Sequence, residues 1–523
     1  MRNKVILLVL GISISIMFES TSLAVTEEVN LVTDIYPGSI GSGPGSLTVF
    51  DDVMYFGART PGTGTELLRF DSNTVSIVAD INPGSESSSP GDLTVYNGEL
   101  YFTARGASGS RQLYEFDGNS VSPAPDSSAS QNPQEFFVFD GNIYFRATKF
   151  DVYGTELWKY DGNNQTVIDI VPGPGHSGPK HFVEFQGNLY FNAISQLWRY
   201  NGTVATLVDA NVNPEWPVVF EGQLCFSSYN SVYGRELWRY DGINPSERIT
   251  DINPDSNSSN PSGMTVYNGA IYFNADNGED GCELWRYDGN VAEMVANINP
   301  TPFVPDIDPV HHSNPHDLTV YKGVLYLSAD DGTHGQELWR YGGTQVSMVA
   351  DIYPGQFWSD PTGLTSFGST GYFSADDGVV GSELWSLEPC LSVLAPNGGE
   401  NLVSGSTYSI YWASEDYVND VVIEFSTDSG FDWTEVTPPN AGNNGSYQWL
   451  VPSENSDDCL VRISNANDPN AFDVSDDMFT IFQCQGPLVG DLNGDCYVDF
   501  LDFAMLAEQW LRCGNPFDIA CVE

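Results

Sequence analysis

A twelve-residue stretch near the C-terminus has the side chains and the spacing best suited to chemistry. Oxygen-bearing side chains fall at loop positions 1, 3, 5, 9 and 12, and position 7 can offer its backbone carbonyl. In chain order these positions are Asp491, Asn493, Asp495, Tyr497, Asp499 and Asp502. Because Ca²⁺ takes about six to eight oxygen ligands, the loop can supply most of a coordination shell. The spacing therefore predicts bound Ca²⁺, with a solvated Asp-rich turn as the alternative.

Candidate catalytic groups are sparse. The sequence has no nucleophile elbow, no phosphate-binding glycine loop and no paired-cysteine zinc motif. His311, His312 and His316 lie in the longest insertion between repeats, where scattered imidazoles are a commoner outcome than a metal site. Acid pairs such as Asp330 and Asp331 recur in one turn and favour a role in that turn. We assign no catalytic residue and favour a protein that is not an enzyme; a glycoside hydrolase or polysaccharide lyase is the alternative.

The elements that would position such groups come from one sequence repeat that occurs eight times. Its consensus runs Leu-Thr-Val-Tyr-x-Gly, Leu-Tyr-Phe-x-Ala, Glu-Leu-Trp-Arg-Tyr-Asp-Gly and Val-x-Asp-Ile-x-Pro-Gly. The aromatic anchor of the third segment recurs every 40 to 54 residues. The anchors are Trp158, Trp198, Trp238, Trp285, Trp339 and Trp385, with Leu68 and Tyr114 as weaker copies. Repeats of this length with several short strands are typical of a radial all-β array.

Each repeat predicts four short strands joined by tight turns. In the repeat at 264–300, Asn268-Gly269 and Asp288-Gly289 mark two of the turns. The expected strands there are 264–267, 271–274, 283–287 and 293–298. One four-stranded antiparallel sheet per repeat is a blade of a β-propeller. We expect eight blades over 29–388, with seven as the alternative because 105–129 is degenerate.

The two ends of the array predict a closed ring. The segment 31–38 is a fourth-strand phrase that precedes the first full repeat, whereas the last repeat, 364–387, lacks that phrase. The N-terminal strand can therefore complete the final blade and leave no open edge. An open solenoid is the less favoured alternative, because it would need distinct end caps.

Basic residues recur at one position of the repeat. They are Arg69, Lys159, Arg199, Arg239, Arg286 and Arg340. A structural interpretation pairs them with nearby acids, such as the Glu before the anchor or the Asp of the turn. The alternative is a ring of cations that binds an anionic ligand. We favour the structural role, since a position repeated in most blades usually serves packing.

Two modules follow the repeats. Short alternating strands and turns over 391–482 predict a β-sandwich, with spacing or adhesion as its role. In the tail, 484–523, the calcium loop precedes Phe503, Leu506, Ala507 and Trp510, whose helical spacing predicts a short helix.

The cysteines divide into two groups. Cys225 and Cys282 lie within the repeats, where we expect buried thiols, or less favourably a pair. The other six can form disulfides in an exported protein, but the sequence does not decide their connectivity. They are Cys390, Cys459, Cys484, Cys496, Cys513 and Cys521.

The N-terminus and the charge indicate an exported protein. Residues 1–24 combine Arg2 and Lys4, an apolar run and a small-residue cleavage site, as a signal peptide does. The run is shorter than the ~20 residues of a spanning helix, so we expect no membrane span after cleavage. The 70 acidic residues against 19 basic ones predict repulsion of nucleic acid and of anionic membranes. We expect a secreted protein, extracellular or at the cell surface.

Three resemblances extend these expectations. The repeats over roughly 31–387, most clearly at 330–339, resemble the Glu-Leu-Trp-x-x-Asp-Gly-Thr repeat family of secreted bacterial proteins, which implies a β-propeller-like fold but no reaction. The module at 391–482 looks like immunoglobulin or fibronectin type III domains. The tail resembles one repeat of a type I dockerin, especially the dockerin-like tails of planctomycete proteins, which implies Ca²⁺ on the six loop residues and a cohesin-like partner. Loop position 6 is Cys496 where that family has Gly, and a second repeat is missing.

Together these features predict a secreted, non-enzymatic binding or scaffold protein. The propeller would present ligand-binding loops, and the calcium-loaded tail would dock to a partner or to the cell surface. The alternative is a carbohydrate-active enzyme, or its accessory subunit, acting on extracellular polysaccharide.

Overall fold

The computed structural model describes most of the chain between Val29 and Gln483, together with Phe503. The described ranges are 29–149, 152–300, 312–322, 324–343, 345–368, 370–387, 391–414, 418, 420–436, 441–466, 468–475, 477–483 and 503. The chain divides into one compact unit over Glu27–Pro389 and another that contains the residues from Cys390 onward. Each unit is described by itself.

The first unit consists of repeated four-stranded antiparallel sheets, eight of them within its described residues. The strands of the first four full repeats are β2 (Gly45–Phe50), β3 (Val53–Thr60), β4 (Gly64–Phe70), β5 (Val75–Ala79); β6 (Gly91–Tyr96), β7 (Glu99–Arg105), β8 (Arg111–Phe116), β9 (Val121–Pro123); β10 (Gln131–Phe139), β11 (Asn142–Lys149), β12 (Gly154–Tyr160), β13 (Gln165–Ile168); and β14 (Lys180–Phe185), β15 (Asn188–Ala193), β16 (Gln196–Tyr200), β17 (Ala205–Asp209).

The remaining repeats follow the same order, and the last of them includes the first strand of the chain. Their strands are β18 (Glu215–Phe220), β19 (Gln223–Asn230), β20 (Gly234–Tyr240), β21 (Glu247–Arg248); β22 (Ser262–Tyr267), β23 (Ala270–Asp276), β24 (Cys282–Tyr287), β25 (Ala292–Ala296); β26 (His316–Tyr321), β27 (Val324–Asp330), β28 (Gln336–Tyr341), β29 (Val346–Ala350); and β30 (Thr362–Phe367), β31 (Thr370–Asp376), β32 (Ser382–Leu387), β1 (Val29–Thr33). The all-β class and the four strands per repeat are confirmed, including the degenerate repeat, whose sheet is β6–β9.

The repeat β22–β25 shows why these residues form a sheet. The hairpin between β22 and β23 turns at Asn268 and Gly269, with φ of 45° and 75°. Positive φ at both central residues gives the turn type that matches the twist of paired strands. The second and third strands are almost wholly buried, because both faces of each sheet are covered.

Apolar packing joins each sheet to the next. One cluster combines Tyr267, Tyr272 and Leu284 of β22–β25 with Leu325 and Leu327 of β27. Burying such a side chain stabilises the fold by roughly 1.5–3 kcal/mol relative to leaving it exposed. The same pattern joins the last sheet to the first, where Tyr372 and Leu384 pack with Met54, Phe56 and Phe70.

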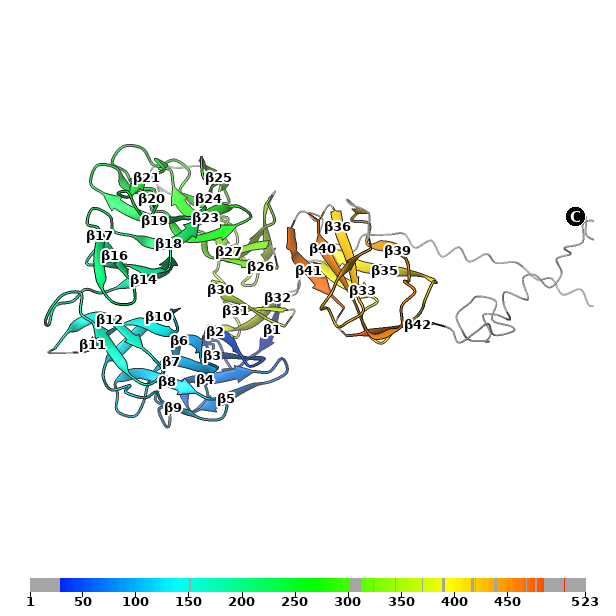
Figure 1. Cartoon of the computed structure of the whole chain (residues 1–523), viewed down its shortest axis with the longest axis horizontal. Helices are drawn as coiled ribbons and strands as arrows, with labels where there is room; N and C mark the ends of the chain where they lie inside the picture. The colour runs from blue at the N-terminus through cyan, green and yellow to red at the C-terminus, as the bar shows by residue number, and fades with distance from the viewer. Residues whose placement is uncertain are drawn as a thin grey trace, which may run out of the picture. The chain divides into compact units, whose positions relative to one another are not determined.

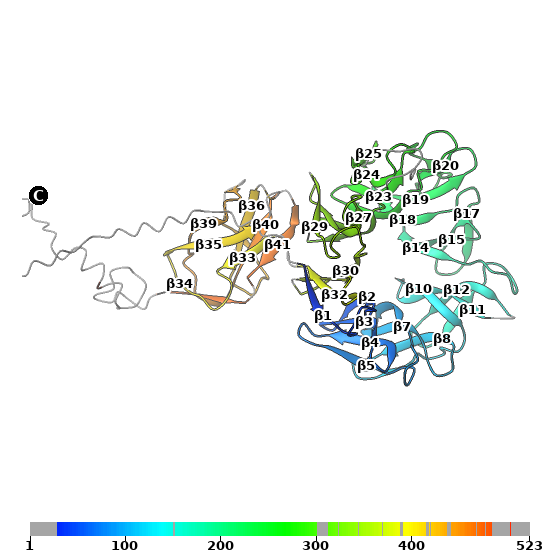
Figure 2. The ribbon, with the colours of Figure 1, turned by 180° about the vertical axis from the view of Figure 1, so that it is seen from behind.

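The ring is closed by the N-terminal strand. β1 pairs antiparallel with β32, so that Leu31 lies opposite Trp385 and Val29 opposite Leu387. The first strands of consecutive sheets are neighbours in chain order, and β30 returns to β2. Figures 1 and 2 show the sheets following one another around a ring, with β1 beside β32. The predicted closure is therefore confirmed.

The first strand of every repeat contains a β-bulge. In β18, for example, Glu215 pairs with Ser227 and Val218 with Cys225, so β18 has one extra residue between these pairs. A bulge bends the strand and re-aims its side chains. The residue inside each bulge has a positive φ; these residues are Ser46, Asp92, Glu135, His181, Trp216, Gly263, Asp317 and Gly363. We call these eight residues, with the residue preceding each, the inner belt.

The second unit contains two sheets around one apolar core. One sheet is β33 (Leu391–Ala395), β35 (Thr407–Ser414) and β39 (Ser446–Leu450). The other is β34 (Asn401–Val403), β42 (Phe479–Phe482), β40 (Ser456–Asn465), β36 (Asp420–Ser426) and β37 (Thr434–Glu435), with β38 (Ala441–Gly442) and β41 (Asp468–Val474) on β36 and β40. Trp412, Ile423, Trp449 and Val461 are among the core side chains. Within the described residues, no helix is long and apolar enough to cross a bilayer.

Candidate ligand-binding site

A buried glutamate fixes the loops that lead to the inner belt. Six sheets carry it, in the Glu-Leu-Trp segment, and none of the six side chains is exposed: Glu66, Glu156, Glu236, Glu283, Glu337 and Glu383. Glu283 accepts hydrogen bonds from the Ile298 amide at 2.7 Å and from the Ser313 amide and hydroxyl at 3.2 and 2.7 Å. Since a buried carboxylate requires such donors, the Glu and its loop stabilise each other. The loop conformation, and hence the start of the next first strand, is thereby fixed.

Three acids of the inner belt connect one repeat to the next. Asp92 accepts a hydrogen bond from the Glu135 amide at 3.0 Å, and Glu135 accepts one from the His181 amide at 2.8 Å. Asp317 accepts one from the Gly363 amide at 3.2 Å. These carboxylates therefore have a structural role in joining neighbouring first strands, whatever else they bind.

The side chains of His181 and Trp216 take no part in these hydrogen bonds between neighbouring first strands. Their rings lie 5.8 Å apart between centroids, and Trp216 is 46% exposed. Trp216 has a φ of 54°, a left-handed conformation that is an outlier for a bulky residue. The equivalent position holds Gly in two repeats, Gly263 and Gly363, where the conformation is free of strain. An exposed aromatic residue kept in a strained conformation marks a candidate binding residue.

A charged cluster adjoins these two rings. Glu215, which precedes Trp216, lies 3.4 Å from the Lys180 ammonium and 3.1 Å from the Arg235 guanidinium. On the neighbouring repeat, Arg146 lies 3.4 Å from Glu135. These five side chains are three cations and two carboxylates, in a chain where acids outnumber bases by 70 to 19.

Several belt groups have shifted pKa values. Burial raises the pKa of Asp92, and burial together with the neighbouring Lys180 lowers the pKa of His181. His316 lies 3.2 Å from Asp360, and this hydrogen bond raises the pKa of His316 and lowers that of Asp360. Shifted pKa values are a feature of functional sites, although structural ion pairs share this feature.

At the repeated basic position, Arg239 and Arg286 pair with nearby acids, as the structural interpretation expects, although these acids are not the two given as examples. Arg239 donates to Glu247 at 2.6 Å and Arg286 to Glu293 at 2.7 Å. In each case the partner is the residue directly opposite on the fourth strand, neither the Glu before the anchor nor the turn Asp. The buried Glu is engaged by loop amides, and the turn Asp caps its own turn, as Asp288 does at 2.9 Å to Asn290.

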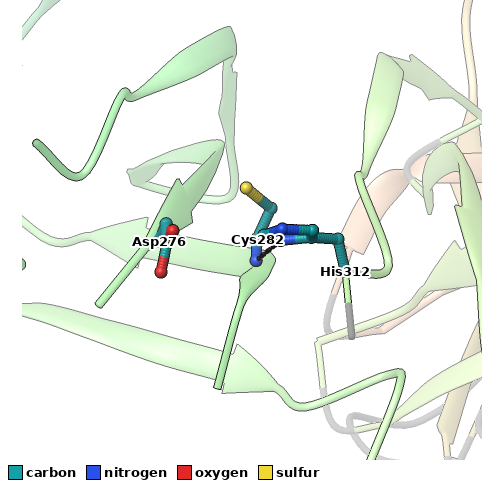
Figure 3. A group of neighbouring side chains, drawn as sticks. All are labelled: Asp276, Cys282 and His312. Atoms are coloured by element: carbon teal, nitrogen blue, oxygen red, sulfur yellow. Dashed lines mark hydrogen bonds between the residues drawn. The ribbon is translucent and has the colours of Figure 1, made fainter. Parts of the chain in front are cut away.

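A second group of side chains has the composition of a metal site. Ligand atoms of Asp276, Cys282 and His312 all lie within 4.8 Å of one another. Figure 3 shows the three side chains as neighbours. However, Nδ1 of His312 accepts the Cys282 amide hydrogen at 2.7 Å, so the neutral ring carries its proton on the other nitrogen. Burial raises the pKa of the metal-free Cys282 thiol to about 11.

Equivalent contacts in other repeats show what His312 does. Ser87, His176 and Ser258 each accept the amide at the matching position, all at 2.9 Å. His312 therefore fastens a loop, and we assign it no metal. His316 has a different partner, and His311 lies outside the described residues.

The predicted tail sites fall outside the part of the chain that the structure describes. The calcium ligands predicted at Asp491, Asn493, Asp495, Tyr497, Asp499 and Asp502 all lie outside the described residues. The same holds for Cys390, Cys484, Cys496, Cys513 and Cys521. The described cysteines Cys225, Cys282 and Cys459 are free thiols, so the pairing considered for Cys225 with Cys282 is absent.

Sequence reasoning did not find the inner belt, although a signal was present. The belt residue stands immediately before the Leu-Thr-Val-Tyr segment, and it varies between repeats while the segment itself is kept. When one position of a regular repeat varies while its neighbours are kept, the residue at that position does not serve the packing that the repeats share.

Comparison with known proteins gives similarity of structure only. No protein-family model and no curated protein sequence matches the chain. Among solved structures, the chain is similar to a prolyl endopeptidase at 11% identity, with a TM-score of 0.42, over 74% of this chain and 59% of that one. The WD40 domain of SCAP from fission yeast matches at 10% identity, with a TM-score of 0.38, over 69% of this chain and 94% of that one.

A lectin is also among the similar structures. The Aleuria aurantia lectin, a six-bladed β-propeller that recognises fucose, matches at 12% identity, with a TM-score of 0.24, over 48% of this chain and 90% of that one. The chain spans about 59% of the length of the prolyl endopeptidase. At these identities and scores the similarities carry no conclusion about activity.

Proposed function

We propose that this chain is an extracellular polysaccharide-binding protein in which an eight-bladed β-propeller presents its ligand site around His181 and Trp216 of the inner belt. The cyclic neighbour order of the first strands and the pairing of β1 with β32 support the eight-bladed ring. The exposed, strained Trp216 beside His181 is the observation that carries the binding role.

The chemistry of these side chains suits a sugar. A pyranose ring offers an apolar C–H face and a rim of hydroxyl groups, so it is recognised by an aromatic side chain that stacks on it and by polar groups beside that side chain. Trp216 provides the aromatic ring, and Glu215, Lys180 and Arg235 provide hydrogen-bond donors and acceptors. A rigid ring of sheets holds these groups on strand bulges rather than on long loops.

Polysaccharide binding is tested by affinity electrophoresis of the full chain through gels that contain one polysaccharide each. We expect retardation in at least one gel, and equal mobility in all gels would refute the proposal. Parallel incubations are assayed for new reducing ends. Release that is lost in Asp92→Asn or Glu135→Gln would favour the alternative, a carbohydrate-active enzyme whose acids come from different repeats.

The remaining modules supply delivery and attachment in this proposal. Export follows from the signal-like segment 1–24, the sandwich acts as a spacer, and the tail binds Ca²⁺ and docks to a cohesin-like or other cell-surface protein. Calorimetry of the full chain with Ca²⁺ tests the tail, with Asp491→Ala/Asp495→Ala as the matched variant. If the parent chain and the double variant release equal heats on addition of Ca²⁺, the calcium assignment is wrong.

A further inference from the structure

One sector of the inner belt differs from the rest of the molecule in charge. The side chains of Arg146, Lys180 and Arg235 gather around Glu135 and Glu215, within 3.4 Å of a carboxylate in each case. Cations thus exceed acids here, whereas the whole chain has a formal net charge of −51. Among these five side chains, three cations face two carboxylates.

The cluster is more than a set of surface ion pairs. The side chain of Arg235 is only 19% exposed, and both Lys180 and Arg235 converge on the single carboxylate of Glu215. One cation would be enough to neutralise Glu215. The second cation contributes a positive charge that Glu215 does not neutralise, and a ligand carboxylate can share it.

The exposed aromatic ring lies next to that charge in the chain. Trp216 directly follows Glu215, and His181 directly follows Lys180, so the ring pair lies at the same two bulges as the Lys180–Glu215 ion pair. Burial and Lys180 both lower the pKa of His181, so its ring is neutral near pH 7 and can pack against Trp216 without a charge of its own.

We propose that the belt sector of β10, β14 and β18 binds an anionic saccharide, with Trp216 stacked on a sugar ring and Lys180 and Arg235 holding its carboxylate or sulfate group. The inference rests on the proposed polysaccharide-binding function and adds the class of sugar and the residues. A negatively charged polymer is repelled by the acidic surface elsewhere, so the local excess of cations directs it to this sector.

The test uses three oligosaccharides of equal length with the full chain. They are a galacturonic acid hexamer, the same hexamer with every carboxylate methyl-esterified, and a sulfated galactose hexamer. We expect at least one charged hexamer to bind about tenfold more tightly than the ester, as a charge-assisted hydrogen bond would require, and its affinity to fall as salt is raised. The two charged probes separate carboxylate from sulfate as the recognised group.

Trp216→Gly provides the decisive variant. Glycine favours the left-handed conformation at this position, so the variant should unfold no more easily than the parent protein. We expect its affinity for the charged hexamer to fall by about 10-fold or more, as loss of an aromatic anchor does. Ser46→Gly makes the same replacement at the equivalent bulge of β2 and should leave affinity unchanged. Lys180→Met should abolish the preference for the charged hexamer over the ester.

The outcomes separate this inference from the proposed function. Equal affinity for the charged hexamers and the ester would overturn the anionic class while leaving polysaccharide binding in place. Affinity unchanged in Trp216→Gly would overturn the assigned sector. The inference would also be overturned if neutral polysaccharides retard the protein in gels but none of the three hexamers binds it. If no polysaccharide retards the protein, the proposed function itself is wrong.

Discussion

Leu31 lies directly opposite Trp385 in the pairing of β1 with β32, so residues from the two ends of the repeat array share one sheet. The side chain of Glu383 reinforces this closure. It accepts hydrogen bonds from the amides of Ile35, Tyr36 and Ser42, at 3.1, 3.1 and 2.9 Å, and from the Ser42 hydroxyl at 2.5 Å. The ring is thus held by strand pairing and by one buried carboxylate.

Glu383→Ala should destabilise the whole ring. Three amides and a hydroxyl lose their acceptor, and each unsatisfied buried donor costs roughly 1–3 kcal/mol. We expect the free energy of unfolding, measured by urea denaturation, to fall by at least about 3 kcal/mol. Glu279→Ala, at an exposed turn position, is the control and should change it by less than about 0.5 kcal/mol. A similar loss in both variants would show that Glu383 does not secure the closure.

The buried glutamates predict a fold that weakens as pH rises. Burial raises the pKa of Glu283 and of Glu337 to about 7, whereas an unfolded Glu titrates near pH ~4.3. The folded state therefore holds these protons more tightly, and the stability they contribute is full below about pH 4 and lost as pH rises through 7. We expect the melting temperature to fall between pH 5 and pH 8. The double variant Glu283→Gln/Glu337→Gln should show a smaller fall, and an unchanged slope would contradict the assignment.

The repeated arginines should affect stability slightly and binding not at all. The Arg286 and Glu293 side chains are 38% and 53% exposed, and exposed ion pairs contribute about 0.2–1 kcal/mol. Arg286→Ala should lower the free energy of unfolding by no more than that, with polysaccharide mobility shifts unaltered. A double-mutant cycle with Glu293→Ala measures the pair. Loss of polysaccharide binding in Arg286→Ala would instead favour the alternative, a ring of cations that binds an anionic ligand.

His316 should titrate above the ordinary range of histidine. Its hydrogen bond to Asp360 raises the pKa of His316 and is the largest cause of that shift. A titration followed by NMR of the His316 ring should show a midpoint above that of a free histidine. Asp360→Asn removes the charge but keeps an acceptor, so the midpoint should move down. A midpoint that is the same in both proteins would mean that the two side chains do not pair in solution.

Much of the ring could be predicted from the sequence because its signals are local. Two-residue turns such as Asn268-Gly269 locate the hairpins. The fourth-strand segment at 31–38, which precedes the first full repeat, indicated the strand that completes the last sheet. The role of Glu283 could not be predicted in the same way. Its partners, Ile298 and Ser313, are placed by loop conformation, and hydrogen bonds to backbone amides leave no pattern in side-chain type.

The inner belt was missed for a similar reason. A bulge adds one residue to a strand without changing its composition, so the positive φ of Trp216 cannot be read from that repeat alone. Only the comparison of repeats reveals it, since Gly263 and Gly363 occupy the equivalent place. The particular acid that pairs with Arg286 could not be named because the register of the fourth strand, which brings Glu293 opposite Arg286, was not known.

The chain enters the ring at Val29 and leaves it at Leu387, and these two residues are direct neighbours across β1 and β32. A short linker could therefore join them, and new ends could be opened in a hairpin such as the one at Asn268. Such a circularly permuted protein would keep every sheet and would be closed by ordinary hairpin connections instead of a returning strand.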